Sequence, residues 1–235
     1  MTSQILTRSG RAVVEYCNLI QFCPKTVYMV GIGPCHEETQ VITSAWPDTD
    51  LVGFEPNPII QEQLKKDFPG RFFTYALSNY VGKGSLYSPN RWKNGASLFR
   101  VEKHHSIFPV EVTKLDALGP FLACPSGRDS LLWLDCEGSE LDVLLGGEEF
   151  VTERIAAINV EMTGMPHVQG GCKPIQVHRW LVKNGFLQTW SHTHRTTVGQ
   201  WDGIYLRYEI FKPQFCNSLD SVERYENWGN LVSPT

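Results

Sequence analysis

The sequence predicts an α/β fold in which a seven-stranded, mostly parallel sheet carries helices on both faces. Apolar, strand-like runs alternate with helix-like runs from the first third of the chain onward, a pattern typical of such a sheet. The 235 residues are 42% hydrophobic and 20% charged, which suits one domain with a substantial core and excludes a disordered or fibrous chain. Two turns rich in glycine or acidic residues follow apolar strands, where open α/β sheets bind their ligands.

The first half of the chain divides into three helices and three strands. Val13, Cys17 and Ile20 recur on one helical face, so an opening helix is expected to end near Pro24. In chain order, the other expected elements are a strand at 26–32, a helix at 37–45, a strand at 51–55, a helix capped by Asn57, started by Pro58 and burying Ile60, Leu64 and Phe68, and a strand at 72–77.

The second half of the chain supplies four more strands. Ser139, followed three residues later by Asp142, resembles a capping box and predicts a helix with Leu141, Leu144 and Leu145 facing inward. Two glycines should end this helix. The remaining elements are expected to be strands at 130–135, 155–162, 186–190 and 203–208, the last two antiparallel, with a helix at 174–184.

One domain with two short flanking segments is expected. Residues 1–24 form an N-terminal helix, residues 25–211 form the domain, and residues 212–235 form a polar tail. Within the domain, residues 78–109 are a turn-rich excursion, with a hairpin as one option. No apolar run reaches the roughly 18 residues of a membrane-spanning helix, and seven cysteines without a Cys-x-x-Cys spacing indicate reduced thiols. We therefore expect a cytoplasmic protein that does not enter a membrane.

The charge balance limits the class of partner. The net charge of −4, from 21 Lys and Arg against 25 Asp and Glu, argues against the broad basic surface that duplex nucleic acid requires. In the excursion, basic residues interleave with aromatic ones, which fits a solvated lid, single-stranded nucleic acid or an anionic small substrate, and the acidic chain favours the lid. We expect a small or weakly charged partner. The oligomeric state stays open, with a homodimer as one option.

A glycine turn marks the first candidate site. The segment VGIGPCHEE places Gly31 and Gly33 between a buried strand and a helix, and Glu55 ends the next strand. Such a turn lets the backbone approach a nucleotide, while a carboxylate on the neighbouring strand accepts hydrogen bonds from ribose hydroxyls. A dinucleotide site would need a third glycine where His36 stands. That site and a purely structural turn are the alternatives.

The second candidate site is the segment WLDCEGSE, in which a core strand ends at Asp135 and Glu137. The carboxyl ends of central strands face the ligand crevice of an open α/β sheet, so Asp135 is placed to touch a reacting group. A buried acid at the end of an apolar strand is uncommon without a task. The alternative is that Glu137 and Glu140 are acids favoured by a helix N-terminus.

In order and spacing, the segments GIGPCHEET, FEPNP, YALSNYVGKGSLY, LDCEGSELDVLLGG and INVEM resemble the FkbM-type family of S-adenosylmethionine-dependent methyltransferases. The resemblance spans roughly Lys25 to Arg207. It implies a Rossmann-like class I methyltransferase fold, S-adenosylmethionine as the methyl donor, and a small-molecule or glycan acceptor.

The resemblance also assigns parts of the donor to individual residues, although the first loop departs from the family. Gly31 stands where an Asp is usual, and Glu37 stands where a Gly is usual. Glu37 either holds the donor's ammonium group in place of that Asp or only stabilises the helix N-terminus. The implied contacts are the ribose with Glu55 beside Pro56, the adenine with Leu77 and Ser78, the methionine part with the backbone at Ile32 and Gly33, and the methyl-transfer side with Asp135; Gly31 is also expected among the donor-binding residues.

Methyl transfer to a hydroxyl requires a base, because the acceptor must lose its proton as charge develops. Asp135, His36 and Glu161 are the candidates, in that order. No metal site is expected, since His192 and His194 lack a neighbouring carboxylate in sequence. We expect an O-methyltransferase. The alternatives are an NAD- or nucleotide-binding Rossmann protein and a catalytically silent methyltransferase-like binding module.

Overall fold

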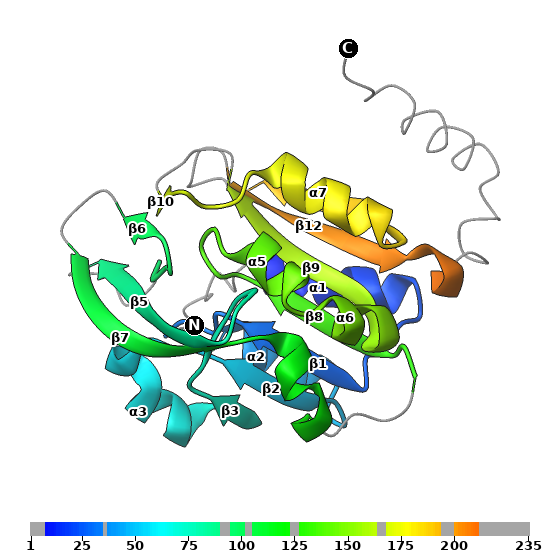
Figure 1. Cartoon of the computed structure of the whole chain (residues 1–235). Coiled ribbons are helices and arrows are strands. Elements are labelled where there is room, and N and C mark those ends of the chain that lie inside the picture. The colour runs from blue at the N-terminus through cyan, green and yellow to red at the C-terminus, as the bar shows by residue number, and fades with distance from the viewer. Residues whose placement is uncertain are drawn as a thin grey trace, which may run out of the picture.

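A seven-stranded sheet forms the centre of the protein (Figure 1). The strand order is β11-β12-β9-β8-β1-β2-β3; the five strands from β9 to β3 are parallel, and β12 runs antiparallel to both of its neighbours. The expected fold class is therefore confirmed. The structure is a computed structural model, and it describes residues 8–34, 37–89, 95–101, 105–122, 127–163, 168–193 and 200–211.

The strands of this sheet coincide closely with the apolar runs of the sequence. Buried residues occupy every position of β1 and β8, as expected for central parallel strands that are covered on both faces. The strand bounds are β1 Thr26–Val30, β2 Asp50–Phe54, β3 Arg71–Phe73, β8 Ser130–Leu134, β9 Ile155–Thr163, β11 Phe186–Thr193 and β12 Gln200–Arg207.

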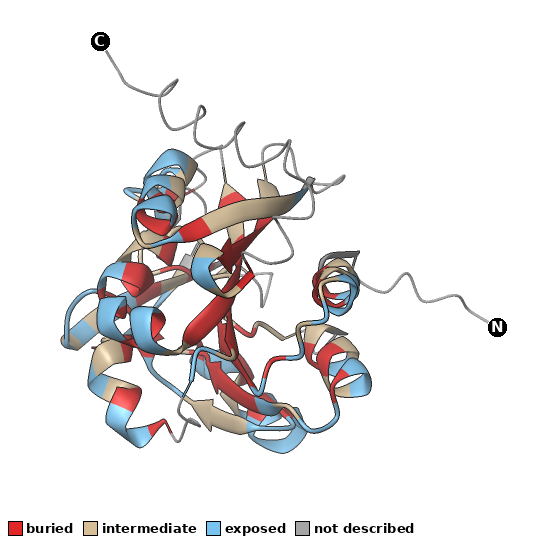
Figure 2. Ribbon diagram, turned by 90° about the vertical axis from the view of Figure 1, so that its right-hand side faces the viewer, coloured by how far each residue is buried: buried red, intermediate tan, exposed pale blue. Residues whose placement is uncertain are grey.

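Helices on the two faces bury two separate apolar cores. Successive side chains of β1 alternate between them: Val27 and Met29 join the core under α1, α2 and α3, whereas Tyr28 and Val30 join the core under α5, α6 and α7. Figure 2 shows buried residues along the strands and exposed residues on the outer sides of the helices. The helix bounds are α1 Arg8–Leu19, α2 Glu37–Ala45, α3 Pro58–Asp67, α4 Leu115–Leu118, α5 Glu140–Leu145, α6 Glu148–Arg154 and α7 Pro174–Lys183.

A second, three-stranded sheet forms much of the segment expected to be a turn-rich excursion. Its order is β4-β7-β5, and β5 and β7 pair antiparallel along their whole length around a small core that includes Leu86 and Val112. The expected single strand at 72–77 is wrong, because β3 belongs to the main sheet and the next strand belongs to this one. The bounds are β4 Ala76–Leu77, β5 Gly82–Pro89, β6 Arg100–Val101, β7 His105–Thr113 and β10 Val168–Gln169, and β6 pairs with β10 in a separate two-stranded sheet.

Local predictions have mixed outcomes. The cap of α3 is confirmed, since Asn57 Oδ1 accepts the N–H of Ile59 at 3.1 Å. The capping box at Ser139 is wrong, because its side chain makes no cap hydrogen bond and Asp142 instead accepts from Asn79 Nδ2 at 2.9 Å. Leu145 is also not inward, with an exposed fraction of 44%, because α5 ends there and the separate helix α6 follows.

The topology brings four strand ends to one edge of the main sheet. Because β1, β2, β8 and β9 are parallel, their carboxyl ends meet there, and the antiparallel strand β12 begins at the same edge. The expected tail at 212–235 lies outside the described residues. Within the described part of the chain, no helix has the length and apolar character needed to cross a membrane.

Candidate functional site

A cavity of about 300 Å³ opens at this carboxyl edge. Its walls come from the ends of β1, β2, β8 and β9, from the start of α2 and of β12, and from the three-stranded sheet through β4 and β5. The described residues that line it include no Lys, Arg or His, so their charge favours a positively charged ligand. Five of the lining residues are acidic: Glu38, Glu55, Asp135, Glu137 and Glu161.

The glycine turn after β1 is pressed against the end of β8. A Cβ on Gly31 would lie 1.8 Å from the carbonyl oxygen of Asp135, and the φ of Gly31 is +81°, so glycine is required there. The N–H of Asp135 donates to Val30 O at 3.0 Å, and the N–H of Gly31 donates to Phe54 O at 3.0 Å. The close approach of these strand ends excludes the Asp that the family pattern has at this position.

Glu55 directly follows β2 and is 5% exposed. Its Oε2 accepts the N–H of Gly33 at 3.0 Å, and its Oε1 accepts the N–H of Asn57 at 2.9 Å. Burial raises the pKa of Glu55, whereas hydrogen bonds from the backbone of Asn57, Gly33 and Ile32 lower it. Each carboxylate oxygen has a second lone pair. The side chain is thus a fixed acceptor with capacity left for ligand hydroxyl groups.

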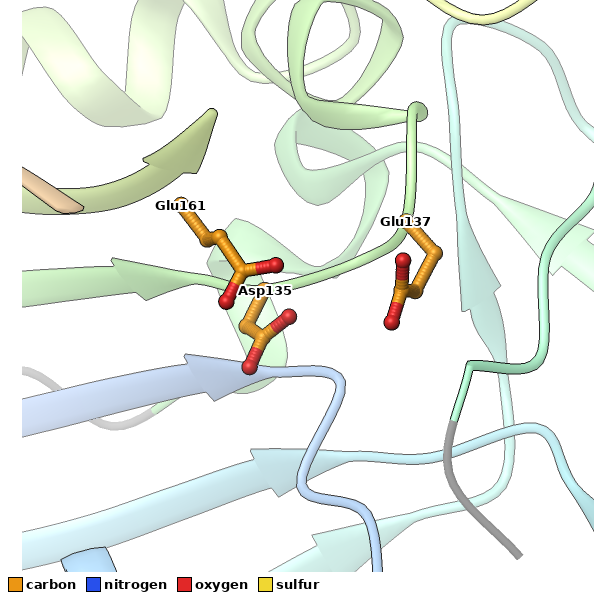
Figure 3. A group of neighbouring side chains, drawn as sticks. All are labelled: Asp135, Glu137 and Glu161. Carbon is orange, nitrogen blue, oxygen red and sulfur yellow. The ribbon is translucent and has the colours of Figure 1, made fainter. Parts of the chain in front are cut away.

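Three carboxylates meet where β8 and β9 end (Figure 3). Asp135, Glu137 and Glu161 offer oxygen atoms that all lie within 4.8 Å of one another. Gln200 Nε2 donates to Glu161 Oε1 at 3.0 Å. Burial raises the pKa of Asp135 well above its usual range, and the neighbouring negative charges, that of Glu161 foremost, raise it further. We call these three residues the acidic group; its proximity alone assigns no metal ion.

The turn between β8 and α5 brings Glu137 to the acidic group. Glu137 and Gly138 have φ angles of +50° and +97°, both in the left-handed region. Glu140 closes the turn, because its Oε1 accepts the N–H of Cys136 at 3.2 Å and of Gly138 at 3.0 Å. Its Oε2 accepts the thiol of Cys172 at 3.2 Å. Glu140 is 5% exposed, and burial raises its pKa. It is therefore an internal brace of the turn, not a solvated acid at a helix end.

Most of the site residues expected from the sequence lie together around this cavity. Ser78 does not line it: Ser78 is 2% exposed, and its carbonyl oxygen lies 2.0 Å from where a Cβ on Gly146 would be. His36 and the side chain of Glu37 lie outside the described part of the structure. The expected residues that do line the cavity are Gly31, Ile32, Gly33, Glu55, Pro56, Leu77, Asp135 and Glu161.

The polar lining residues that the sequence does not predict include Glu38, Tyr75 and Gln200. Glu38 lines the cavity from the first turn of α2, one residue after the acid that was singled out. The adjacent acids Glu37 and Glu38 are visible in the sequence. Helical periodicity alone does not show which of the two faces the cavity, because that depends on what packs beside the helix. Tyr75 was hidden in a strand that was expected to be continuous. Gln200 begins β12 three residues before its expected start, and no motif marks it.

Comparison with solved structures finds chains of similar fold. The plantazolicin methyltransferase BpumL in complex with a triazolic desmethylPZN analog and SAH is 8% identical, with a TM-score of 0.49, covering 87% of this chain and 86% of that chain. Cofactor-bound Rv0187 from MTB is 14% identical, with a TM-score of 0.48 and coverages of 88% and 83%. Magnesium protoporphyrin IX methyltransferase from Synechocystis PCC 6803 with bound SAM is 9% identical, with a TM-score of 0.47 and coverages of 85% and 78%.

Comparison of the sequence with known proteins identifies the family. No curated protein matches the chain. The family model described as the methyltransferase FkbM domain matches residues 35–187, which is more than half of the 235 residues. That stretch begins two residues before α2, ends at the start of β11 and includes Glu55 and the acidic group. The chain therefore belongs to the FkbM methyltransferase domain family.

Proposed function

We propose that this protein is an S-adenosylmethionine-dependent O-methyltransferase that acts on a hydroxyl group of a small molecule or glycan. The main support is the position of Glu55, a buried carboxylate fixed by two backbone N–H groups beside the glycine turn. Glu55 stands in the same cavity as the acidic group. One cavity therefore offers a carboxylate that can accept hydrogen bonds from the donor's hydroxyl groups, and a separate group of carboxylates that includes the candidate bases. The family membership of the chain agrees with this proposal.

The donor would occupy the part of the cavity formed by β1, β2 and β4. The free lone pairs of Glu55 would accept hydrogen bonds from the ribose hydroxyls, and Leu77, which is 3% exposed and lines the cavity, would border the adenine. The backbone at Ile32 and Gly33 leaves open space, because no atom of a described residue lies within 4 Å of a Cβ on Gly33. The methionine part of the donor would pass there toward Asp135.

The acceptor would lie against the acidic group. S-adenosylmethionine supplies an activated methyl group on a sulfonium, so the protein's main contribution is to position the acceptor oxygen in line with it. As the new C–O bond forms and the C–S bond breaks, the acceptor hydroxyl loses its proton. We assign the role of base to Asp135, with Glu161 as the second candidate, because both carboxylates face this part of the cavity.

A thermal-shift comparison of S-adenosylmethionine, S-adenosylhomocysteine, NAD and ATP tests the donor. A ligand at 100 times its dissociation constant stabilises the folded state by roughly 2.7 kcal/mol, which is easily measured. We expect S-adenosylmethionine and S-adenosylhomocysteine to raise the melting temperature, and NAD and ATP to leave it unchanged. A shift with NAD or ATP alone would rule out the methyltransferase and favour the nucleotide-binding alternative.

A second experiment separates donor binding from turnover. The variant Asp135→Asn should keep the affinity for S-adenosylhomocysteine, measured by calorimetry, and should lose methyl transfer to any acceptor found in a screen of hydroxylated small molecules and glycans. Transfer at the wild-type rate by this variant would remove Asp135 from the role of base. The same assay on Glu161→Gln would then test the second candidate.

A further inference from the structure

Ser97 is a buried residue of the segment between β5 and β6, and it connects the three-stranded sheet to the site. Its exposed fraction is 0%. It pairs with Tyr87 of β5 through two backbone hydrogen bonds, of 2.8 Å from the N–H of Tyr87 and 2.9 Å from the N–H of Ser97. The backbone of Ser97 is therefore fixed on β5, at the cavity wall to which Leu86, Ala96 and Leu98 contribute.

The side chain of Ser97 reaches across to the turn that carries Glu137. Its Oγ donates to the carbonyl oxygen of Glu137 at 2.7 Å and accepts the N–H of Phe99 at 3.0 Å. Both polar functions of the hydroxyl are therefore used, one on each side of the contact. Forty positions separate Ser97 from Glu137 in sequence, so this bond is a tertiary link between the small sheet and the site.

A second link closes the same turn from the other side. The N–H of Cys172 donates to the carbonyl oxygen of Gly138 at 2.9 Å, and β10 in the same segment pairs with β6. A Cβ on Gly138 would meet Gly171 Cα at 3.2 Å and the ring of Phe99 at 3.8 Å. Two stretches that are distant in sequence, 97–99 and 168–172, thus converge on the backbone of residues 137 and 138.

Glu137 needs such support because its backbone is unfavourable by itself. A non-glycine residue with a φ of +50° is held in the left-handed region only when its surroundings define it. The carbonyl group that Ser97 holds belongs to this same residue, so the bond restrains the backbone of Glu137 from which the side chain extends. That side chain is the member of the acidic group that does not belong to β9 or follow β8 directly.

We propose that Ser97 is a positioning residue that holds the backbone of Glu137, so that the Glu137 carboxylate faces Asp135 and Glu161. The catalytic meaning of this arrangement rests on the proposed function, in which Asp135 is the base. Without the hydroxyl of Ser97, the turn relaxes and the Glu137 carboxylate moves away from Asp135. The small sheet thereby influences the arrangement of the three carboxylates, although it supplies no charged group to them.

The pKa of Asp135 reports on this arrangement, because the negative charge of Glu137 is one of the influences that raise it. The charged groups that raise this pKa, after burial, are Glu161 and Asp202 from the neighbouring strands and Glu137 and Glu140 from the turn. We would label the protein with aspartate carrying ¹³C in the carboxyl group and follow the Asp135 resonance during a pH titration. The variant Asp135→Asn identifies that resonance by its absence.

Ser97→Ala is expected to lower the titration midpoint of Asp135, in the same direction as Glu137→Gln. The double variant should show no further shift beyond Glu137→Gln, because both changes remove one influence. The matched control is Ser88→Ala, which removes another hydroxyl of 0% exposure from the small sheet, one whose Oγ has no hydrogen-bond partner among the described residues. That control should leave the midpoint unchanged.

An unchanged midpoint in a folded Ser97→Ala protein would overturn the proposal, and so would a shift that adds to that of Glu137→Gln. If Ser97→Ala does not fold, Ser97→Cys takes its place, since a thiol of similar size is a weaker hydrogen-bond donor and should give a smaller shift in the same direction. The titration uses the protein without ligand. Failure to bind S-adenosylhomocysteine would therefore count against the proposed function and leave the role of Ser97 to be decided by the midpoint.

Discussion

Glu55 illustrates how one residue can serve both the fold and a ligand. Its carboxylate accepts the N–H groups of Gly33 and Asn57, which fixes the glycine turn and the start of α3 with the same side chain. Buried at 5% exposure, the group remains a hydrogen-bond acceptor, because the backbone donors Asn57, Gly33 and Ile32 do not use all the lone pairs of its two oxygens. A ligand hydroxyl would then meet an acceptor that needs no reorganisation.

The first prediction concerns the charge of Glu55. Glu55→Gln should weaken S-adenosylhomocysteine binding by about 1.5 to 3 kcal/mol, or roughly 10- to 150-fold in dissociation constant, because a charged acceptor is lost. Isothermal titration calorimetry measures the affinity, and the melting temperature without ligand shows how much of the fold is retained. The control Glu62→Gln, at an exposed position of α3, should bind as the wild type does. Unchanged affinity in Glu55→Gln would contradict the ribose assignment.

The second prediction concerns the pH dependence of stability that Asp135 causes. Burial first, and then the charges of neighbouring carboxylates, raise the pKa of Asp135 in the folded protein. Between the ordinary Asp pKa of about 4 and this raised value, the folded state keeps a proton that the unfolded chain has released. The stabilising contribution of the group is therefore complete below the ordinary value and is lost as the pH rises through the raised one.

Asp135→Asn should accordingly gain stability relative to the wild type as the pH rises. The variant carries no charge at any pH, so its free energy of unfolding avoids the cost of ionising a crowded carboxyl. Urea unfolding of both proteins at several pH values between 4 and 9 measures the difference. A difference that is constant over this range would show that Asp135 titrates normally and that the acidic group does not crowd it.

At the scale of elements, the site depends on how closely the ends of β1 and β8 approach. The carbonyl oxygen of Asp135 lies where a side chain on Gly31 would have to be. The hydrogen bond from Asp135 N to Val30 O extends the pairing of these two strands by one residue. The glycine turn thus helps to determine the position of the Asp135 backbone at the end of β8, where its side chain enters the cavity.

The third prediction compares the two glycines of this turn. Gly31→Ala should destabilise the protein by about 3 kcal/mol or more, because the new Cβ collides with backbone that cannot move away. Gly33→Ala has a similar backbone, with a φ of +65°, but no described residue lies within 4 Å of its Cβ, so it should cost only about 1 to 2 kcal/mol. Chemical unfolding compares them. Equal losses would mean that the left-handed backbone, not the contact with β8, makes glycine necessary.

Elements with a strong periodic pattern could be predicted from the sequence, and elements defined by partners could not. The helix at 37–45 and the strands β1, β8 and β9 agree with their apolar runs, because burial on one or both faces determines the choice of residue. Of the three-stranded sheet, the sequence indicates only a turn-rich segment with a hairpin as one option, which fits the antiparallel pair β5 and β7, because its core is small and Gly82 and Gly84 interrupt β5. Its contact through Ser97 joins positions forty residues apart, and no local pattern can reveal such a pairing.

The candidate site follows the same division. Glu55 and Asp135 were predicted because each ends an apolar strand, and the fold rule that gathers strand ends at one edge then places them in one cavity. Gln200 and Glu38 were missed because their role depends on which strand or helix turn lies beside them. The resemblance of Glu140 to an ordinary helix-terminal acid concealed its part in closing the turn.

At the scale of the whole molecule, β12 connects the site edge of the sheet with the opposite edge. It begins at Gln200, which binds Glu161, and it ends at Arg207, about 24 Å away for an extended strand of this length. Arg207 is 4% exposed, and burial lowers its pKa to about 10, so it is charged at neutral pH. Arg207 is a buried cation at the far edge, whereas the described residues that line the cavity at the site edge include five acids.

Arg207 joins the elements that meet at that far edge. Its guanidinium group donates to Ile155 O at 2.9 Å, to Val151 O at 2.8 Å and to Asn184 O at 3.3 Å. These carbonyls belong to the start of β9, to α6 and to the cap of α7. The guanidinium carbon also lies 4.2 Å from the centroid of the Phe186 ring. One side chain therefore satisfies carbonyl groups from three elements, two of them in buried hydrogen bonds.

The fourth prediction is that a substitution at the Arg207 end of β12 lowers the stability of the protein without changing its affinity for the ligand. Arg207→Met should lower the free energy of unfolding by at least about 2 kcal/mol, because buried carbonyl groups lose their donor while a side chain of similar length still fills the space. The control Arg128→Met removes an exposed ion pair with Glu209, an interaction generally worth about 0 to 1 kcal/mol. In both variants the affinity for S-adenosylhomocysteine should equal that of the wild type, because the cavity lies at the other edge. Calorimetry measures the affinity, and urea unfolding independently measures the free energy of unfolding. A loss of affinity in Arg207→Met, measured under conditions where the variant is folded, would show that the far edge also determines the geometry of the site.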